Sequence, residues 1–217
     1  MIRTHQKEFI ELILTRQVLR FGQFTLKSGR VSPYFFNAGL INDGHALGTI
    51  GVCYAQAIIE SGLPFDMLFG PAYKGIPLAT AVAIALSNRH GRNVPVAFNR
   101  KEAKLLGEGG SLIGAPLAGR VLIVDDVITA GTAIRESIDI ISAVGAMPAG
   151  VVLALDRQER GQSALSAVQE IQTAFSIPVV RIITLGDIIE HMESAGRPDD
   201  LAGLRNYRSR YGVDGEA

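Results

Sequence analysis

The strongest constraint on this chain is a regular alternation of apolar strand segments with helical segments from residue 45 onward. The strand segments are continuous apolar runs, such as Val121-Leu-Ile-Val, which indicates burial on both faces. Such strands form a parallel sheet that is covered by helices and joined by right-handed crossovers, and ligands bind beyond the carboxyl ends of its strands. The predicted elements are helices at 45–61, 75–89, 132–144 and 163–174, and strands at 65–69, 94–98, 121–124, 150–155 and 179–183.

The N-terminal residues follow a different pattern. Residues 5–20 place apolar side chains at helical spacing among charges, which predicts an amphipathic helix. Two short extended segments, at 24–27 and 33–37, surround turn residues and predict a small β-rich lobe. A length of 217 residues favours one domain. The predicted divisions are a hood at about 1–43, a core at about 44–185 that includes a lid loop at about 99–116, and a C-terminal helical tail at about 186–217.

Composition excludes several classes of protein. With 21 basic and 21 acidic residues, the chain has no general attraction for nucleic acid, so an anionic ligand needs a local site. Its apolar stretches are shorter than the roughly 20 residues that span a bilayer, and its charged N-terminus is unlike a signal peptide, so a cytoplasmic protein is expected. Cys53, in an apolar stretch, is expected in the core. The histidines lack metal-ligand spacing and are expected at the surface: His5, His45, His90 and His191.

The residues after the strand at 121–124 combine two carboxylates with small and hydroxyl-bearing residues. Asp125 and Asp126 can accept hydrogen bonds from the vicinal hydroxyls of a sugar or help to hold a hydrated Mg²⁺. The backbone N–H groups that follow can close around a phosphate at the positive end of the helix beginning near Thr132. A capped turn after a buried strand would not explain two adjacent carboxylates. The combination predicts a ribose-phosphate site.

The same segment, Val121-Leu-Ile-Val-Asp-Asp-Val-Ile-Thr-Ala-Gly-Thr-Ala, resembles the phosphoribosyl pyrophosphate (PRPP) fingerprint of type I phosphoribosyltransferases. Six further segments resemble orotate phosphoribosyltransferases in order and spacing, and the resemblance covers most of residues 5–185. They are Phe24-Thr-Leu-Lys-Ser-Gly-Arg, Ser32-Pro-Tyr-Phe-Phe-Asn, Gly70-Pro-Ala-Tyr-Lys-Gly-Ile-Pro, Asn99-Arg-Lys-Glu-Ala-Lys, Gly107-Glu-Gly-Gly and Asp156-Arg-Gln-Glu-Arg. The resemblance implies the type I phosphoribosyltransferase fold, a mainly parallel twisted α/β sheet flanked by helices, with a small N-terminal hood and a mobile lid loop.

The resemblance implies a reaction as well. A pentosyltransferase of this family transfers the ribose 5-phosphate group of PRPP to N1 of orotate, with Mg²⁺, and forms orotidine 5′-monophosphate and pyrophosphate in pyrimidine (UMP) biosynthesis. The implied catalytic residues are Lys27, Lys101, Lys104, Asp125 and Asp126, and the two aspartates would hold the metal directly or through water or the ribose hydroxyls. The implied PRPP contacts are Lys27, Tyr73, Lys74, Arg100, Lys101, Lys104, Asp125, Asp126, Val127, Ile128, Thr129, Ala130, Gly131, Thr132 and Ala133.

Orotate is a flat pyrimidine with a carboxylate, so its pocket needs an apolar or aromatic wall and cationic or N–H donors. The residues that the resemblance assigns to this pocket are Lys27, Phe35, Phe36, Thr129 and Arg157. Because adjacent residues of a strand face opposite sides, at least one of the two phenylalanines is expected in the core.

The pyrophosphate group of PRPP needs donors of its own. Tyr73-Lys74-Gly75 opens a helix, where Gly75 lets the backbone approach a phosphate and Lys74 adds positive charge. Residues 99–116 contain several glycines and the cations Arg100, Lys101 and Lys104, with little periodicity. They predict a mobile lid whose cations stabilise charge on the departing pyrophosphate.

The lid also departs from the family pattern. The family reads Asp-His at the positions where this chain has Leu105 and Leu106, so the family's histidine contact with pyrophosphate does not carry over.

The resemblance further implies a twofold homodimer in which Arg100 and Lys104 reach the neighbouring subunit's active site. Two alternatives stay open. A PRPP-binding regulator or inactive paralogue would not need the orotate pocket and the lid cations that this chain keeps. A transferase for another base, such as adenine or uracil, would not need Lys27 and Arg157, which suit the orotate carboxylate.

Overall fold

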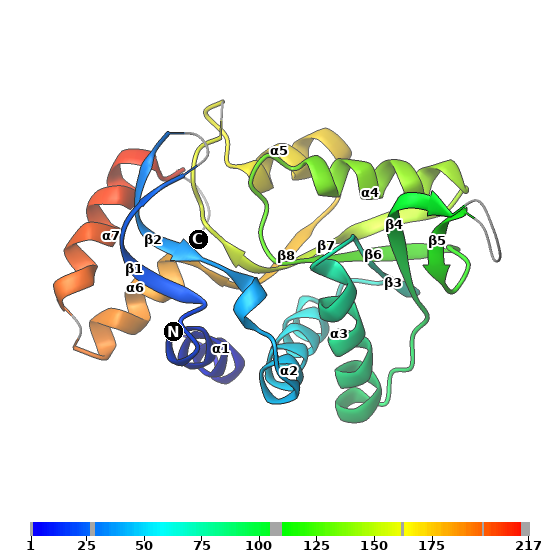
Figure 1. Cartoon of the computed structure of the whole chain (residues 1–217), viewed down its shortest axis with the longest axis horizontal. Coiled ribbons are helices and arrows are strands. Elements are labelled where there is room, and N and C mark those ends of the chain that lie inside the picture. The colour runs from blue at the N-terminus through cyan, green and yellow to red at the C-terminus, as the bar shows by residue number, and fades with distance from the viewer. Residues whose placement is uncertain (1, 27–28, 105–109, 162, 197, 214–217) are drawn as a thin grey trace.

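The chain folds around a six-stranded sheet in which the strand order is β5-β4-β3-β6-β7-β8. The structure is a computed structural model that describes residues 2–26, 29–104, 110–161, 163–196 and 198–213. Helices cover both faces of the sheet, and a separate pair of strands stands at one end of the molecule beside the C-terminal helices (Figure 1). Among the described residues, no helix is both long and apolar enough to cross a lipid bilayer.

The sequence alternates between strands and helices along most of its length. The helices are α1 (Thr4–Thr15), α2 (Gly44–Ser61), α3 (Gly75–His90), α4 (Thr132–Ala143), α5 (Ala167–Phe175), α6 (Leu185–Ser194) and α7 (Pro198–Tyr211), with a 3₁₀ turn at Ala38–Leu40. The strands are β1 (Leu19–Thr25), β2 (Val31–Phe36), β3 (Met67–Gly70), β4 (Val96–Lys104), β5 (Gly110–Gly114), β6 (Arg120–Asp125), β7 (Met147–Asp156) and β8 (Val179–Thr184).

The strand order reverses beside β3, and this reversal places the site. β3 pairs in parallel with β4 on one side and with β6 on the other, and β7 and β8 continue the sheet beyond β6. Strand β5 pairs antiparallel with β4 at the sheet edge. In sheets of this type, ligands bind at the carboxyl ends of the strands where the order reverses, which here are Gly70 and Asp125. The predicted α/β architecture with a mainly parallel sheet is confirmed.

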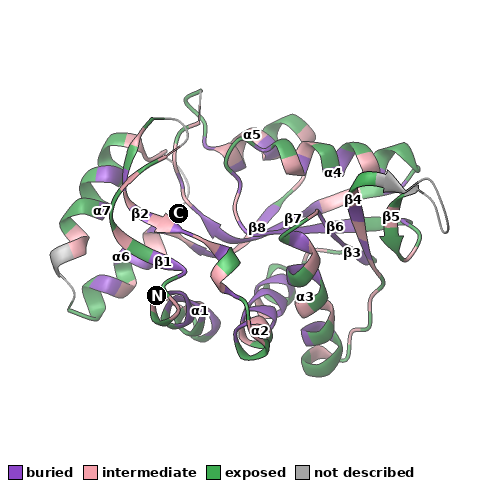
Figure 2. Cartoon of the chain, in the orientation of Figure 1, coloured by how far each residue is buried: buried purple, intermediate pink, exposed green. Residues whose placement is uncertain are grey.

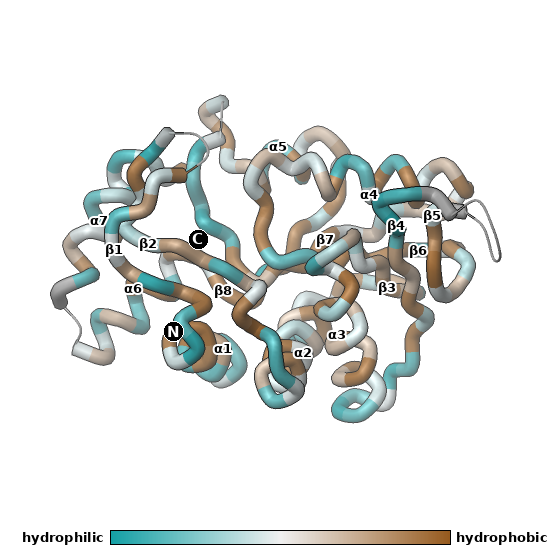
Figure 3. The backbone as a smooth tube through the Cα atoms, viewed as in Figure 1, coloured by the Kyte–Doolittle hydropathy of each residue, from teal (hydrophilic) through white to brown (hydrophobic). Residues whose placement is uncertain are grey.

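Successive residues of the central strands pack into two different cores. Leu68 and Leu122 belong to the core formed with α2 and α3, whereas Phe69 and Ile123 belong to the core formed with α4 and α5. Because both faces are covered, these strands read as unbroken apolar runs. Figure 2 and Figure 3 show the sheet as a buried, apolar layer between two layers of helices. Cys53 is fully buried in the first of these cores, as predicted.

The N-terminal hood contains a two-stranded antiparallel sheet made of β1 and β2. Helix α7 lies against β2, and Tyr207 meets Tyr34 edge to face with 6.1 Å between the ring centroids. The hood and the C-terminal helix therefore pack together, although they stand at opposite ends of the sequence.

Some sequence predictions differ from the structure at the ends of the helices. The first helix ends at Thr15, not at residue 20, because the chain turns at Gln17, whose φ is +55°, and then enters β1. Helix α5 begins later than predicted because Ser166 caps it and accepts a hydrogen bond from the N–H of Gln169.

The surface position predicted for the histidines is wrong for His5. This residue is only 7% exposed because α1 packs against α2, and its Nδ1 lies 3.6 Å from a carboxylate oxygen of Glu60. Burial lowers the pKa of the His5 imidazole, with the charge of Glu60 partly opposing that effect. His5 is therefore a satisfied packing residue.

The segment predicted as a loop at 99–116 is partly an antiparallel hairpin. Strand β4 continues to Lys104, and β5 returns from Gly110, with Asn99 opposite Leu112. The sequence hides this hairpin because β4 runs through four consecutive polar residues, 99–102, which show no alternation with apolar residues. Residues 105–109, including Leu105 and Leu106, lie outside the described part of the chain. The lid function stays a prediction.

We expect Gly51→Ala to destabilise the protein by about 1–3 kcal/mol, because a Cβ at Gly51 would lie 2.6 Å from the carbonyl oxygen of Ala81 where α2 crosses α3. The matched control is Gly48→Ala in the same helix, where a Cβ meets nothing within 4 Å. That change should stabilise the helix by up to about 1 kcal/mol. Urea unfolding of the two variants measures both effects, and equal midpoints would contradict the close approach.

Candidate active site

Two adjacent buried carboxylates occupy the end of β6. Asp125 is 9% exposed and Asp126 is 5% exposed. The carbonyl oxygen of Asp125 accepts a hydrogen bond of 2.7 Å from the Tyr54 hydroxyl, and that of Asp126 accepts from the N–H groups of Ala154 and Leu155 in β7. The carboxylate of Asp125 itself accepts from the N–H of Asp126 at 2.9 Å. The backbone that carries the pair is therefore fixed from both sides.

The loop after β3 brings a cation to this pair. Lys74 Nζ lies 2.7 Å from a carboxylate oxygen of Asp126, while the lysine side chain remains 52% exposed. The loop is held by Asn99 of β4, whose side-chain oxygen accepts a 2.7 Å hydrogen bond from the N–H of Ala72. Gly75 packs so closely on β6 that a Cβ there would lie 2.9 Å from the carbonyl oxygen of Val124. Residues that follow β3 and end β6 thus converge on one site, which Asn99 of β4 supports.

The two carboxylates carry more negative charge than the protein neutralises. Burial, followed by the charge of Asp126, raises the pKa of Asp125 to about 7, and Lys74 only partly offsets this. An added cation would relieve this repulsion, and carboxylate oxygens are the protein ligands that Mg²⁺ prefers. Asp125 and Asp126 could hold a Mg²⁺ only together with oxygen ligands from water or a bound molecule, since the described residues contain no cluster of three potential metal ligands.

The residues after the carboxylates enclose a cavity. It has a volume of about 230 Å³ and is lined by Asp125, Val127, Ile128, Thr129, Ala130, Gly131, Thr132, Ala133 and Ile134. Gly131 adopts a left-handed conformation with φ +74° immediately before α4. Backbone N–H groups at the N-terminus of that helix are suited to bind an anion. The predicted phosphate loop, residues 127–133, is therefore gathered around one cavity at a helix N-terminus, beside the carboxylate pair.

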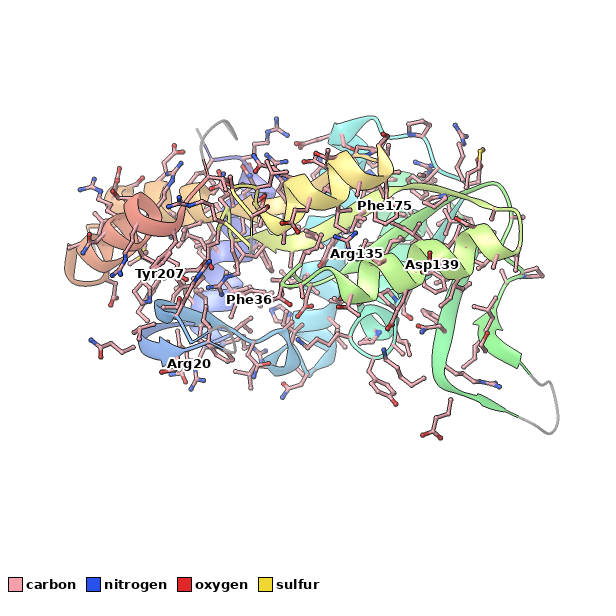
Figure 4. The ribbon with its side chains drawn as sticks, turned by 90° about the horizontal axis from the view of Figure 1, so that it is seen from above. Arg20, Phe36, Arg135, Asp139, Phe175 and Tyr207 are labelled. Carbon is pink, nitrogen blue, oxygen red and sulfur yellow. The ribbon has the colours of Figure 1, made fainter. Side chains whose placement is uncertain are left out.

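The predicted base-binding residues are divided between core and surface. Phe36 is 8% exposed and packs in the core, so the expectation that at least one of the phenylalanines is a core residue is confirmed. Phe35, its neighbour on β2, is half-buried and stacks on Phe24 with 5.5 Å between centroids. Figure 4 shows Phe36 at the same end of the molecule as Tyr207 of α7, away from Asp139 on α4. Lys27 lies outside the described residues.

Arg157, the cation predicted to meet the orotate carboxylate, is already paired. Its Nη2 and Nε lie 2.7 Å and 2.9 Å from one carboxylate oxygen of Glu159. Its side chain is 13% exposed, and the guanidinium carbon lies 4.4 Å from the centre of the Tyr34 ring. The guanidinium therefore offers oriented donors to a ligand, whereas much of its charge is compensated.

The residues predicted to contact pyrophosphate differ in their exposure and in their partners. Lys101 Nζ lies 3.5 Å from a carboxylate oxygen of Glu136 on α4, with both side chains about half exposed. Nη1 of Arg100 is buried with no hydrogen-bond partner among the described residues. Tyr73 is 73% exposed at the loop after β3. The side chain of Lys104 is outside the described part of the chain, so the structure brings only Lys74 of this group to the carboxylates.

Several residues that build the site were not found by sequence reasoning. Asn99 stands directly after a predicted strand end, and that position was the available signal. Tyr54 lies inside a helix and Glu159 inside a charged loop, and neither position has a local pattern that indicates its contact with the site.

Comparisons with known proteins agree with this geometry. A family model described as a phosphoribosyl transferase domain matches residues 39–179. An orotate phosphoribosyltransferase of Thioalkalivibrio sulfidiphilus is 63% identical over 98% of this chain and 100% of its own length. This chain belongs to the orotate phosphoribosyltransferase family. The enzyme of that name from Yersinia enterocolitica is 58% identical, again over 98% of this chain and 100% of its own length.

The family also includes a solved structure with the same fold. A crystal structure of orotate phosphoribosyltransferase from Francisella tularensis superposes with a TM-score of 0.86 at 45% identity, and it covers 94% of this chain and 99% of its own chain. The family model begins at residue 39, after β2, but the relatives align along nearly the whole chain. The hood and the C-terminal helices are therefore common to this chain and those relatives.

We expect Asp125 to lower the free energy of unfolding of the ligand-free protein as the pH rises from about 4 to about 7, because over this range Asp125 ionises in the unfolded chain but stays protonated in the folded one. Asp125→Asn should remove this contribution and raise Tm at pH 8 more than at pH 5. Thermal unfolding without PRPP or Mg²⁺ measures the difference. Asp139→Asn, an exposed position on α4, is the matched control. A lower Tm for Asp125→Asn than for the parent at pH 8 would contradict the raised pKa.

Proposed function

We infer that this chain is an orotate phosphoribosyltransferase, a pentosyltransferase of pyrimidine biosynthesis. The observation that carries this function is the full-length identity of 57–63% to curated orotate phosphoribosyltransferases. The carboxylate pair beside the cavity of about 230 Å³ supports it, since a ribose phosphate needs acceptors for its hydroxyls and donors for its phosphate. The substrates are PRPP and orotate, and the products are orotidine 5′-monophosphate and pyrophosphate.

The reaction replaces one bond at C1 of the ribose with another. The bond between N1 of orotate and C1 forms, the bond between C1 and the pyrophosphate oxygen breaks, and N1 loses its proton. Positive charge develops on the sugar ring while negative charge develops on pyrophosphate. We propose that Asp125 and Asp126 hold the ribose hydroxyls and stabilise the positive sugar, and that residues 127–133 bind the 5-phosphate.

The leaving group needs positive charge at the opposite side of the sugar. Lys74, in the loop after β3, already donates a hydrogen bond to Asp126. It can therefore turn this donor toward pyrophosphate without a large movement. We propose that Tyr73, Arg100, Lys101 and Lys104 supply further contacts, for which Lys101 must leave Glu136. When bound, Mg²⁺ would neutralise charge on the pyrophosphate oxygens. The dimer, the lid's reach into a neighbouring site and the cytoplasmic location stay predictions.

Orotate would lie between the hood and the phosphate loop. We propose that Phe35 and Phe36 form the side of this pocket that belongs to β2, and that Lys27 and Arg157 meet the carboxylate. Thr129, exposed in the loop after β6, would approach the base from the sugar side. The pairing of Arg157 with Glu159 makes the arginine an oriented hydrogen-bond donor more than a free cation.

We expect the double variant Asp125→Asn with Asp126→Asn to lose at least about 10²-fold in kcat, because the amides cannot stabilise a positive sugar as carboxylates do. Formation of orotidine 5′-monophosphate in the presence of Mg²⁺ measures the loss. Asp139→Asn again serves as the control and should keep the parent rate. Near-normal turnover of the double variant would contradict the proposed role of the pair.

The choice of base is tested separately. We expect a PRPP-dependent loss of orotate absorbance with Mg²⁺, and no comparable use of adenine or uracil under the same conditions, because neither base can engage donors that are placed for a carboxylate. Use of adenine or uracil at a similar rate would assign the chain to another base. PRPP binding without turnover of any of the three would indicate a regulator or an inactive paralogue.

A further inference from the structure

A buried polar cluster joins three distant segments of the chain beside the proposed base pocket. Glu159, in the loop after β7, accepts hydrogen bonds from the Tyr34 hydroxyl of β2 at 2.9 Å and from the Tyr207 hydroxyl of α7 at 3.0 Å. The same carboxylate holds the guanidinium of Arg157. Ser32 of β2 completes the cluster, with its hydroxyl oxygen 3.4 Å from Nη2 of Arg157.

Burial makes this cluster rigid. Tyr34 is fully buried and Tyr207 is 5% exposed, while the side chain of Glu159 is only 12% exposed. Burial and the charge of Glu159 raise the pKa of Tyr207, and burial does the same for Tyr34, so both phenols remain hydroxyl donors at physiological pH. Each carboxylate oxygen of Glu159 therefore has at least one fixed donor. A carboxylate satisfied in this way has few alternative positions.

The cluster fixes one edge of Arg157 and leaves another available. Glu159 accepts hydrogen bonds from Nε and Nη2 of Arg157, and the Tyr34 ring covers one face of the guanidinium. No described residue accepts a hydrogen bond from Nη1 of Arg157. An arginine held by one edge and one face can present its remaining N–H donors in only one direction, which suits recognition of a planar carboxylate.

The end of the chain holds the same loop in place. The N–H of Arg160 donates to the carbonyl oxygen of Tyr211 at 2.8 Å, and the N–H of Val213 donates to that of Gln158 at 3.1 Å. Nη2 of Arg30, from the hood, donates to the carbonyl oxygen of Gly161 at 3.0 Å. The loop that carries Arg157 is therefore bound on both sides by elements outside the sheet.

We propose that Glu159, anchored by Tyr207, is a positioning residue that aims Arg157 at the orotate carboxylate, so that the C-terminal helix α7 is a working part of the base site. This inference rests on the proposed function, because it assumes that Arg157 meets orotate. It goes beyond that function in assigning the orientation of the arginine to a carboxylate and a phenol that do not touch the substrate.

The first test separates orientation from charge at position 159. Glu159→Gln keeps an oxygen that can accept from Nε and Nη2, and its amide can donate to the Tyr207 oxygen, whereas Glu159→Ala removes both contacts. We expect Glu159→Ala to raise KM for orotate roughly tenfold, the scale of one lost charge-assisted hydrogen bond, with KM for PRPP unchanged. Glu159→Gln should restore KM for orotate to within about threefold of the parent, since only the charge is lost.

The second test acts through α7 and avoids leaving a buried guanidinium without its anion. Tyr207→Phe keeps the ring that packs on Tyr34 and removes only the hydroxyl that holds Glu159. We expect it to raise KM for orotate about threefold and to leave kcat and KM for PRPP unchanged. The matched control is Tyr211→Phe, in the same helix and with its ring 4.9 Å from that of Tyr207, which should behave as the parent.

A third measurement tests recognition of the carboxylate on the base directly and does not depend on turnover. Titration calorimetry compares orotidine 5′-monophosphate with uridine 5′-monophosphate, which lacks the carboxylate. The preference of the parent for the carboxylated nucleotide should fall roughly tenfold in Glu159→Ala and about threefold in Tyr207→Phe. A merely structural role would lower Tm and leave this ratio unchanged, and that result would overturn the proposal.

Measurements on the wild-type protein distinguish the proposed function from the positioning role of Glu159. If the wild type does not convert orotate, or binds both nucleotides equally, the proposed function or its assignment of Arg157 fails. If the wild type is active and selective but Glu159→Ala and Tyr207→Phe keep its KM and its preference, only the positioning role of Glu159 fails. If Tyr211→Phe shifts KM as much as Tyr207→Phe, the effect is one of helix packing, and the positioning role fails as well.

Discussion

The site depends on the removal of two neighbouring carboxylates from water at the end of β6. The pair does not stabilise the sheet, because burial and mutual repulsion raise the pKa of Asp125 and disfavour its charged form. The surrounding contacts compensate in part: a lysine from the loop after β3, a tyrosine hydroxyl from α2, and backbone donors from β7. In the proposed reaction, the hydroxyl groups of the ribose and a divalent cation would satisfy these carboxylates, so that binding would also relieve their repulsion.

Much of the sugar-phosphate half could be predicted because its signals are local. Asp125, Asp126 and the phosphate loop are consecutive in the sequence, and the preceding apolar run places them at a strand end. The topological rule for parallel sheets then locates the site without knowledge of any contact. Lys74 could be found in a similar way, because it lies in the short loop between the end of β3 at Gly70 and the start of α3 at Gly75. Only the partner of Lys74 had to come from the structure.

The rest could not be predicted because its contacts join residues that are far apart in sequence. Glu159 and Tyr207 are 48 positions apart, and Tyr34 and Glu159 are 125 apart, so no periodicity connects them. The hairpin of β4 and β5 was missed for another reason. Strand β4 runs through four consecutive polar residues, 99–102, so its sequence there resembles a loop. His5 could have been placed from the sequence, because its helical spacing aligns it with the buried Phe9 and Leu12, and it was misplaced because residue type was weighed above spacing.

The contact between α7 and the hood has a consequence for the order in which the protein assembles. The sugar-phosphate half draws its side chains from residues 74–134, a stretch whose loops close over moderate lengths of chain. The proposed base half must join residues 34, 159 and 207, and its hydrogen bonds link residues 48 and 125 positions apart. During synthesis from the N-terminus, Tyr34 and Glu159 are both made before Tyr207, so Glu159 stays without the hydroxyl of Tyr207 until α7 has been made. If Glu159 orients Arg157 as proposed, that orientation is complete only after α7 has been made.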